Sequence, residues 1–243
     1  MISKERVHKV IASRGYTSRR KAEVLIKEGK VLVNGEKITD VATTIDPRAD
    51  IVVEGQRLQA VEKITYVFYK PTGAVSTTLD EHDRTTVVDF IADDRRLYPV
   101  GRLDYDTSGL LLLTNDGELA NRLMHPKHKI EKEYVVTFEG FLRKETSSKL
   151  RRGIVLDGKK TQGAKIFDVR SNTKTKRTTA HVVITEGKNH HIRRMFEAFG
   201  HPVIRLKRIR YGHLTLAGLA KGQYRTLTPH EYKELYVKSE LST

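Results

Sequence analysis

Two carboxylates stand close together in the segment GRLDYDTSG (residues 101–109), directly before a run of four leucines. Polar side chains on a loop that a rigid strand positions are often the groups that bind or catalyse. Calcium is one use to consider, because Asp104 and Asp106 are spaced like the first and third ligands of a twelve-residue calcium loop. That loop needs a Glu at its twelfth position, where this chain has Asn115, and helices on both sides. A strand is expected to follow directly, so calcium binding is excluded.

Two other roles for these carboxylates stay open from the residues alone. Asp side chains in turns accept backbone N–H hydrogen bonds, and this structural role is the favoured interpretation of Asp106, shared with Thr107 and Ser108. Asp104 is either a turn residue of the same kind or a catalytic carboxylate. The local composition does not decide between these two roles.

The net charge indicates which kind of partner the chain binds. Forty-five Lys and Arg against thirty Asp and Glu give a formal net charge of +15 over 243 residues. A protein this basic commonly binds a polyanion, because binding releases the counterions condensed on phosphates. Cations also gather around an apolar helix late in the chain, where we expect an RNA cradle rather than a merely solvated face: Arg193, Arg194, Arg205, Lys207, Arg208 and Arg210.

Several classes of site and partner are excluded by what the sequence lacks. There is no cysteine, hence no disulfide framework and no thiolate metal site. His190 and His191 are adjacent, but no nearby carboxylate completes a ligand set, so no metal is expected. The longest apolar runs, such as residues 110–113, are too short to span a bilayer, and the first residues lack the apolar core of a signal peptide. We therefore expect a cytoplasmic protein without a membrane partner.

The first 60 residues form a pattern of two helices followed by short strands. Thr17 or Ser18 can cap the second helix, and Asn34-Gly35 between two apolar runs predicts a β-hairpin. The apolar positions of the two helices fall on one face each: Val7, Val10 and Ile11 in the first, and Ala22, Leu25 and Ile26 in the second. We expect residues 1–60 to be a small domain, with a joint before residue 65.

Three cations open the second helix, where they oppose the helix dipole. Phosphate binding explains them better, because free backbone N–H groups and cations converge at that end. The helix pair followed by KVLVNG (residues 30–35) resembles the S4-type RNA-binding domain, and a small protein-binding domain is the alternative. The resemblance implies RNA contacts for Arg19, Arg20, Lys21, Lys27, Lys30 and Asn34.

Residues 65–243 alternate strands with short helices, which predicts an α+β domain with a mixed, largely antiparallel sheet. Strands are expected at residues 65–69, 110–114, 133–138, 165–169, 178–185 and 203–210. Helices are expected at residues 86–91, 117–124, 144–151, 190–199 and 229–235.

The seventeen-residue run GRLDYDTSGLLLLTNDG (residues 101–117) resembles the signature of the RsuA/RluB/RluE/RluF family of rRNA pseudouridine synthases. The likeness extends over nearly the whole chain, through KPTG (70–73), His125-Pro126, KEY (132–134) and EGKNHHIRRM (186–195). One departure is His191, where the family pattern has Gln. Within the family, the resemblance is closer to the large-subunit RluB type.

The resemblance implies a role for each matching residue. Asp104 is the catalytic carboxylate, Tyr134 stacks on the flipped-out uracil and Arg193 pairs with Asp104. Leu206 lines the uracil pocket, and further substrate contacts are expected from Arg102, Lys70, Arg194, Lys207 and Arg208. The reaction detaches uracil, rotates it and reattaches it through a ring carbon, so no cofactor or metal is expected. Whether Asp104 attacks the sugar or removes a proton from it stays open.

The expected function is therefore isomerisation of a specific uridine in 23S rRNA, by a monomer that acts on rRNA or a pre-ribosomal particle. A 16S rRNA enzyme and a non-catalytic assembly factor are the alternatives, and the intact set of Asp104, Tyr134 and Arg193 argues against the second. An RNA methyltransferase with the same N-terminal domain would show a Gly-x-Gly cofactor loop, which the sequence lacks.

Overall fold

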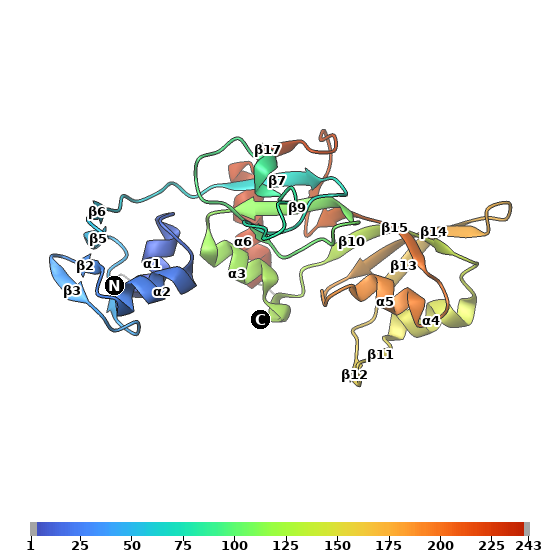
Figure 1. Cartoon of the computed structure of the whole chain (residues 1–243). Helices are drawn as coiled ribbons and strands as arrows, with labels where there is room; N and C mark the ends of the chain where they lie inside the picture. Colours follow the sequence, from blue (N-terminus) through green and yellow to red (C-terminus); the bar gives the residue numbers. More distant parts are fainter. Residues whose placement is uncertain (1–3, 241–243) are drawn as a thin grey trace. The chain divides into compact units, whose positions relative to one another are not determined.

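The computed structural model describes residues 4–240 (Figure 1). The chain divides into two compact units. One contains the N-terminal segment through Ile64 together with residues 93–97 and 115–117, and the other contains the rest of the chain. Among the described residues, no helix is both long and apolar enough to cross a membrane.

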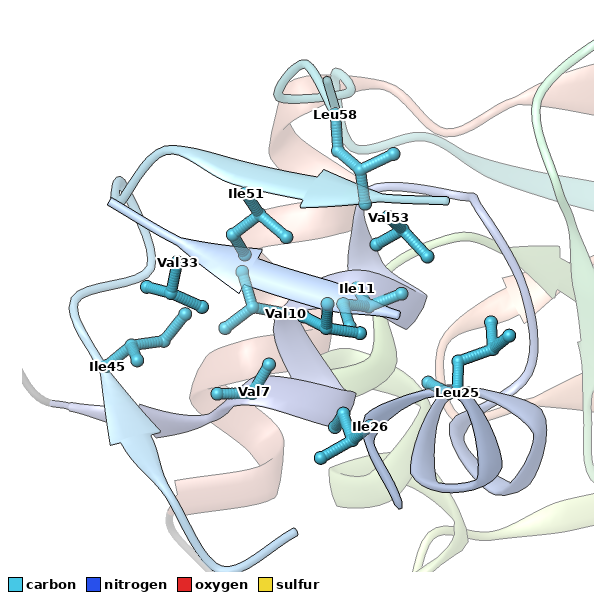
Figure 2. Packing of buried hydrophobic residues seen from close by; sticks show 12 residues of the cluster. Val7, Val10, Ile11, Leu25, Ile26, Val33, Ile45, Ile51, Val53 and Leu58 are labelled. Atoms are coloured by element: carbon cyan, nitrogen blue, oxygen red, sulfur yellow. The ribbon is translucent and has the colours of Figure 1, made fainter. Parts of the chain in front are cut away.

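The N-terminal unit packs two helices against a small sheet, as predicted. Helices α1 (Val7–Ser13) and α2 (Arg19–Lys27) precede a four-stranded antiparallel sheet of order β3-β2-β5-β6. Its strands are β2 (Val31–Val33), β3 (Glu36–Ile38), β5 (Ile51–Val53) and β6 (Gln56–Arg57), and β1 (Glu5–Arg6) pairs with β4 (Thr44–Ile45). Figure 2 shows the shared core, which includes Val7, Val10, Ile11, Leu25, Ile26, Val33, Ile45, Ile51, Val53 and Leu58.

Local signals explain where these elements begin and turn. The Ser18 hydroxyl accepts a hydrogen bond from the Lys21 backbone N–H at 3.2 Å, which confirms Ser18 as the cap of α2. Asn34 and Gly35 have φ angles of 53° and 85°, so both occupy the left-handed region that a two-residue hairpin turn requires. Arg14, by contrast, has a structural role that the sequence did not reveal, because its guanidinium donates to the carbonyls of Pro47, Ala49 and Leu58.

The second unit is built on a nine-stranded sheet with the main order β13-β14-β10-β15-β9-β7-β17. All pairs are antiparallel except β9 with β15, so the predicted mixed, largely antiparallel α+β fold is confirmed. The strands of the main path are β7 (Thr65–Lys70), β9 (Ser108–Thr114), β10 (Lys132–Glu139), β13 (Lys165–Asn172), β14 (Arg177–Ile184), β15 (Val203–Tyr211) and β17 (Tyr224–Thr226). Strand β16 (Leu214–Thr215) pairs with β15, and β8 (Tyr98–Val100) pairs with β9.

Four of the five predicted helices of this unit are present, and one is wrong. The observed helices are α3 (Gly117–Met124), α4 (Lys144–Arg152), α5 (His191–Glu197) and α6 (Pro229–Glu240). The helix expected over residues 86–91 is only a 3-10 turn, η1 (Val88–Phe90), because Val87 donates to the Val75 carbonyl at 3.0 Å in a bridge between extended segments. A second 3-10 turn, η2 (Pro126–His128), and the hairpin β11 (Val155–Leu156) with β12 (Lys159–Lys160) complete the unit.

Strand β9 lies in the interior of the sheet, and it leads directly out of the carboxylate loop. All seven of its residues are buried, which explains why the sequence shows a continuous apolar run here instead of alternation. It pairs with β7 along one edge and with β15 and then β8 along the other. The parallel pairing brings Gly109 against the backbone of Arg208, and a Cβ at Gly109 would lie only 2.2 Å from the Arg208 carbonyl oxygen.

We predict that Gly109→Ala destabilises the second unit by at least about 3 kcal/mol, because backbone cannot give way as a flexible side chain can. Gly109 also has a φ of 123°. Gly218→Ala is the matched control, since Gly218 has a positive φ of 74° but no atom within 4 Å of the added carbon. The control is expected to cost about 1 kcal/mol. Urea unfolding of both variants measures the difference, and equal losses would contradict the close approach of β9 and β15.

Candidate active site

A cavity of about 700 Å³ opens beside the carboxylate loop, entirely within the second unit. Its walls come from segments far apart in the sequence: the loop between β8 and β9, the end of α3, strand β10, the segment between β14 and α5, and strand β15. The side chains that the sequence singled out meet here in part. The lining includes Arg102, Asp104, Lys132, Tyr134, His190, Leu206 and Arg208.

A buried lysine holds the carboxylate loop from below. Lys70 is 0% exposed, and its ammonium donates to the carbonyls of Pro71 and Asp104, each at 3.0 Å, and of Thr107 at 2.9 Å. The prediction that Lys70 contacts the substrate is therefore wrong, because its ammonium is buried and already donates hydrogen bonds to three backbone carbonyls. Burial lowers the pKa of Lys70 to about 8, and the carboxylates of Asp104 and Asp106 oppose this shift.

Further hydrogen bonds fix the loop on its other side. The Ser76 hydroxyl donates to the Leu103 carbonyl at 2.7 Å, and the same hydroxyl accepts from the Leu103 N–H at 3.1 Å. Gly73 donates its N–H to the Tyr105 carbonyl at 2.8 Å. The backbone on both sides of Asp104 is therefore tied to the KPTG segment and to the chain that follows it. Such a loop presents a side chain in a defined direction.

The guanidinium of Arg193 pairs with Asp106 and not with Asp104, so the predicted pairing is wrong. Arg193 Nη2 lies 2.8 Å from Asp106 Oδ2, while Nη1 donates to the Val203 carbonyl at 2.9 Å. The Asp104 carboxylate instead lies beside the His190 ring, with Nε2 3.6 Å from Asp104 Oδ1. Spacing along the chain does not tell which of two carboxylates, two residues apart, faces a given cation, because the turn between them sets their directions.

Tyr134 reaches the cavity with its hydroxyl near a buried arginine. Tyr134 is 7% exposed, and Arg208 Nη1 lies 3.5 Å from its hydroxyl oxygen. Arg208 also donates from Nε to the Leu110 carbonyl at 2.7 Å and lies 5.2 Å from the ring of Tyr211. With only 2% of its surface exposed, Arg208 lines the cavity as a fixed charge that orients Tyr134.

Successive side chains of a strand point to opposite faces of the sheet, so only some of the other predicted substrate contacts of β15 face the cavity. Leu206 and Arg208 face the cavity, whereas Lys207 points to the opposite face of β15, with its ammonium 4.9 Å from the ring of Tyr69. Arg194 bonds to Asp157 away from the cavity lining. The predictions that Lys207 and Arg194 contact the substrate at this site are therefore not supported by the geometry. Arg102, in contrast, lies in the cavity wall.

Lys132 and Glu186 are cavity residues that the sequence analysis missed. The Lys132 ammonium donates to the carbonyls of Ile130 and Thr185, and burial together with the charge of Arg208 lowers its pKa to about 8. Glu186 Oε1 lies 3.1 Å from Nε2 of His191, the residue that departs from the family pattern. Burial lowers the pKa of His191, and Glu186 opposes that shift. Both residues occur in segments already quoted for the resemblance, which was the available signal.

The cations predicted for RNA in the N-terminal unit fall into two groups. Arg19, Arg20, Lys21 and Lys27 are exposed on α2. Lys30 instead bonds to Glu28 and Glu54 at 2.8 and 3.2 Å, and Asn34 accepts a hydrogen bond from the Asp50 N–H. Both are occupied in holding the unit together, which leaves the face of α2 as the candidate RNA surface. Residues 4–240 contain no cluster of three or more side chains arranged for a metal ion.

A carboxylate, an aromatic ring and fixed cations around one cavity suit a flat base that a phosphate backbone carries, which is the site of an RNA-modifying enzyme. The chain belongs to the RNA pseudouridylate synthase family, whose model matches residues 64–198. Residues 5–51 match the S4 domain. The protein is thus an isomerase that forms pseudouridine in RNA, and the resemblance drawn from the sequence is confirmed.

Relatives match the chain over almost its full length. The "Ribosomal large subunit pseudouridine synthase B" of Bacillus subtilis is 50% identical over 232 residues, which is 95% of each chain. An "Uncharacterized RNA pseudouridine synthase" of Aquifex aeolicus is 39% identical, over 95% of this chain and 93% of the length of that protein. A solved structure, "Crystal structure of pseudouridylate synthase", is 32% identical with a TM-score of 0.66 and covers 95% of this chain and 99% of its own.

The depressed pKa of Lys70 predicts how stability depends on pH. Its pKa of about 8 in the folded protein lies below the ordinary lysine pKa of 10.5, so between these pH values the unfolded chain binds more protons than the folded one. Stability attributable to Lys70 therefore rises with pH across this window, by up to about 3 kcal/mol. We expect the free energy of unfolding of wild type minus that of Lys70→Met to grow between pH 7.5 and 10.5. Exposed Lys221→Met is the control, and a flat difference for both variants would contradict a buried charge at Lys70.

Proposed function

We propose that this chain isomerises one specific uridine to pseudouridine in large-subunit rRNA, with Asp104 as the catalytic carboxylate. The observation that carries the proposal is the placement of Asp104, whose backbone carbonyl accepts a hydrogen bond from Lys70 and which lines the same cavity as Tyr134. The large-subunit substrate is supported by the B. subtilis relative, which is named for that subunit and is 50% identical.

The cavity suits a uridine that has left its helix. Its volume of about 700 Å³ lies within the range of roughly 300–1,000 Å³ common for small-molecule sites. In this proposal Tyr134 stacks on the uracil ring and Leu206 packs against its edge, a contact worth about 1–3 kcal/mol per stacked base. Arg102, on the exposed part of the wall, is suited to the phosphate of the flipped nucleotide.

The chemical step is an isomerisation, so atoms balance without a second reactant. The bond from the sugar carbon to the uracil nitrogen breaks and the bond to a ring carbon forms. That carbon loses its proton and the released nitrogen gains one, so no proton is gained or lost overall. Asp104, with 26% of its side chain exposed, is open to the cavity as a nucleophile toward the sugar or a base. Arg193 acts through Asp106 and through the Thr107 hydroxyl, 3.5 Å away, and so positions the loop.

The proposed function also assigns a role to each domain and a partner to the chain. Residues 1–60 form the S4-type domain that binds RNA through α2, and residues 65–243 form the catalytic domain. The partner is rRNA or a pre-ribosomal particle, met in the cytoplasm by a monomer. A small-subunit rRNA substrate is the second candidate, since the cavity itself selects a uridine and not its surroundings.

We predict that Asp104→Asn lowers pseudouridine formation roughly 10⁴-fold while rRNA binding stays within about twofold of wild type. Asp106→Asn is the control, because it removes a neighbouring carboxylate of the same loop and should keep measurable activity. Large-subunit and small-subunit rRNA transcripts are incubated with each protein, and carbodiimide mapping then measures how much pseudouridine has formed and at which position. Full activity of Asp104→Asn would overturn the catalytic assignment, and a product in small-subunit rRNA alone would overturn the proposed substrate.

Deletion of residues 1–60 is predicted to weaken rRNA binding and to reduce its dependence on salt, because the exposed cations of α2 are lost. The deletion retains Glu62 and Ile64, whose backbone groups bond to the side chain of Asn115. Circular dichroism and thermal unfolding check that residues 61–243 stay folded, and filter binding at several salt concentrations measures the affinity. An unfolded product would show that the domain boundary is misplaced.

A further inference from the structure

A basic patch lies at the end of the sheet away from the cavity, and the site described above does not use it. It is formed by the turn between β13 and β14 and by the segment that joins β10 to α4. We call it the distal patch, and its members are all exposed: Phe141, Arg143, Lys144, Lys174, Lys176 and Arg177. Figure 1 shows the β13–β14 turn projecting from this end of the sheet.

The backbone that carries the distal patch is firmly held. The Gly140 N–H donates to the Lys176 carbonyl at 2.8 Å, and the Thr178 hydroxyl donates to the Gly140 carbonyl at 2.6 Å. Thr175 donates its N–H to the Asn172 side chain at 3.1 Å within the turn. The two segments are therefore tied together, so the backbone that carries their cations needs little ordering on binding.

The cations of the distal patch are not neutralised. Within residues 4–240, neither Lys174, Lys176 nor Arg177 forms an ion pair, whereas nearby Arg170 bonds to Asp168. Glu139 is the register partner of Arg177, and Glu145 follows Lys144, so five cations stand against two acids. Phe141 adds an aromatic ring with 45% of its surface exposed. Cations interleaved with an exposed ring are the features that bind nucleic acid backbones and unstacked bases.

Protection of a sheet edge does not explain this arrangement. Edge strands are often blunted with lysines and bulges, and β13 is such a strand, with a bulge between Phe167 and Arg170. Lys174 and Lys176, however, lie on the turn beyond β13, and Arg177 lies on β14, which is paired on both sides. A charge there protects no free edge.

We infer that the distal patch is a second RNA-binding surface, which holds the phosphate backbone of rRNA that flanks the target uridine. Arg177 and Ile184 are the two ends of β14, and Ile184 lines the cavity, so the patch lies roughly 20 Å from the active site along the strand. An RNA just long enough to fill the cavity does not reach it. The surface thus favours a large folded substrate over a short one. This inference rests on the proposed function for the identity of the RNA.

The double variant Lys174→Gln/Lys176→Gln tests the inference against the matched control Lys221→Gln/Lys233→Gln, which also removes two exposed cations of the second unit. Filter binding to a full-length large-subunit rRNA transcript gives Kd at several salt concentrations. Kinetics on that transcript, and on the stem-loop around whichever uridine the wild type modifies, give KM and kcat. Circular dichroism verifies that both variants fold.

For the patch variant we expect Kd and KM on the long transcript to rise about tenfold, and the slope of log Kd against log salt to fall by about 2, one unit for each lysine. On the stem-loop, KM and kcat should match wild type. The control should match wild type on both RNAs.

Equal effects of the two double variants, or no effect of either, would overturn the inference and leave the patch as solvated charge or a protein-docking surface. A raised KM on the stem-loop as well would overturn it too, since the lysines would then act through the active site. If the wild type modifies neither rRNA, the proposed function fails, and the Kd measurements on the long transcript still decide whether the patch binds RNA.

Discussion

The buried ammonium of Lys70 is the contact on which the rest of the site depends. It donates to three backbone carbonyls, two of them on either side of the turn that carries the carboxylates. A buried charge is tolerated only where its hydrogen bonds are satisfied, so the loop and the lysine fix each other. Through this contact the first strand of the catalytic unit sets the direction of a side chain that comes 34 residues later.

The sheet gives this loop a rigid base. Strand β9 starts at the loop, is buried along its whole length and runs parallel to β15, where Gly109 allows the two backbones to approach. Because β15 carries Leu206 and Arg208 into the cavity, the close pairing of these strands also sets the distance between the carboxylate and the opposite wall. Packing and catalysis therefore share one constraint.

Charge is used in two different ways in the second unit. Around the cavity, Arg208 is buried and Lys132 is half-buried, and both are bonded to carbonyls, so they create a fixed field in the cavity. On the surfaces the cations are exposed and free to exchange counterions for phosphates, which gives affinity without sequence information. A net charge alone does not distinguish these uses, because it counts a buried arginine and a solvated lysine equally.

The sequence by itself determined the family, because a seventeen-residue motif is local in the chain. The periodicity of apolar residues is local too, so the sequence also predicted most strands and helices and the division into two domains. It placed Asp104, Tyr134 and Leu206, which all line the cavity. Only the tertiary structure decided that Arg193 pairs with Asp106, that Lys70 lies beneath the loop and that Lys207 faces away from the cavity. Those facts depend on side-chain direction and on contacts between distant segments, which no local pattern of residues encodes.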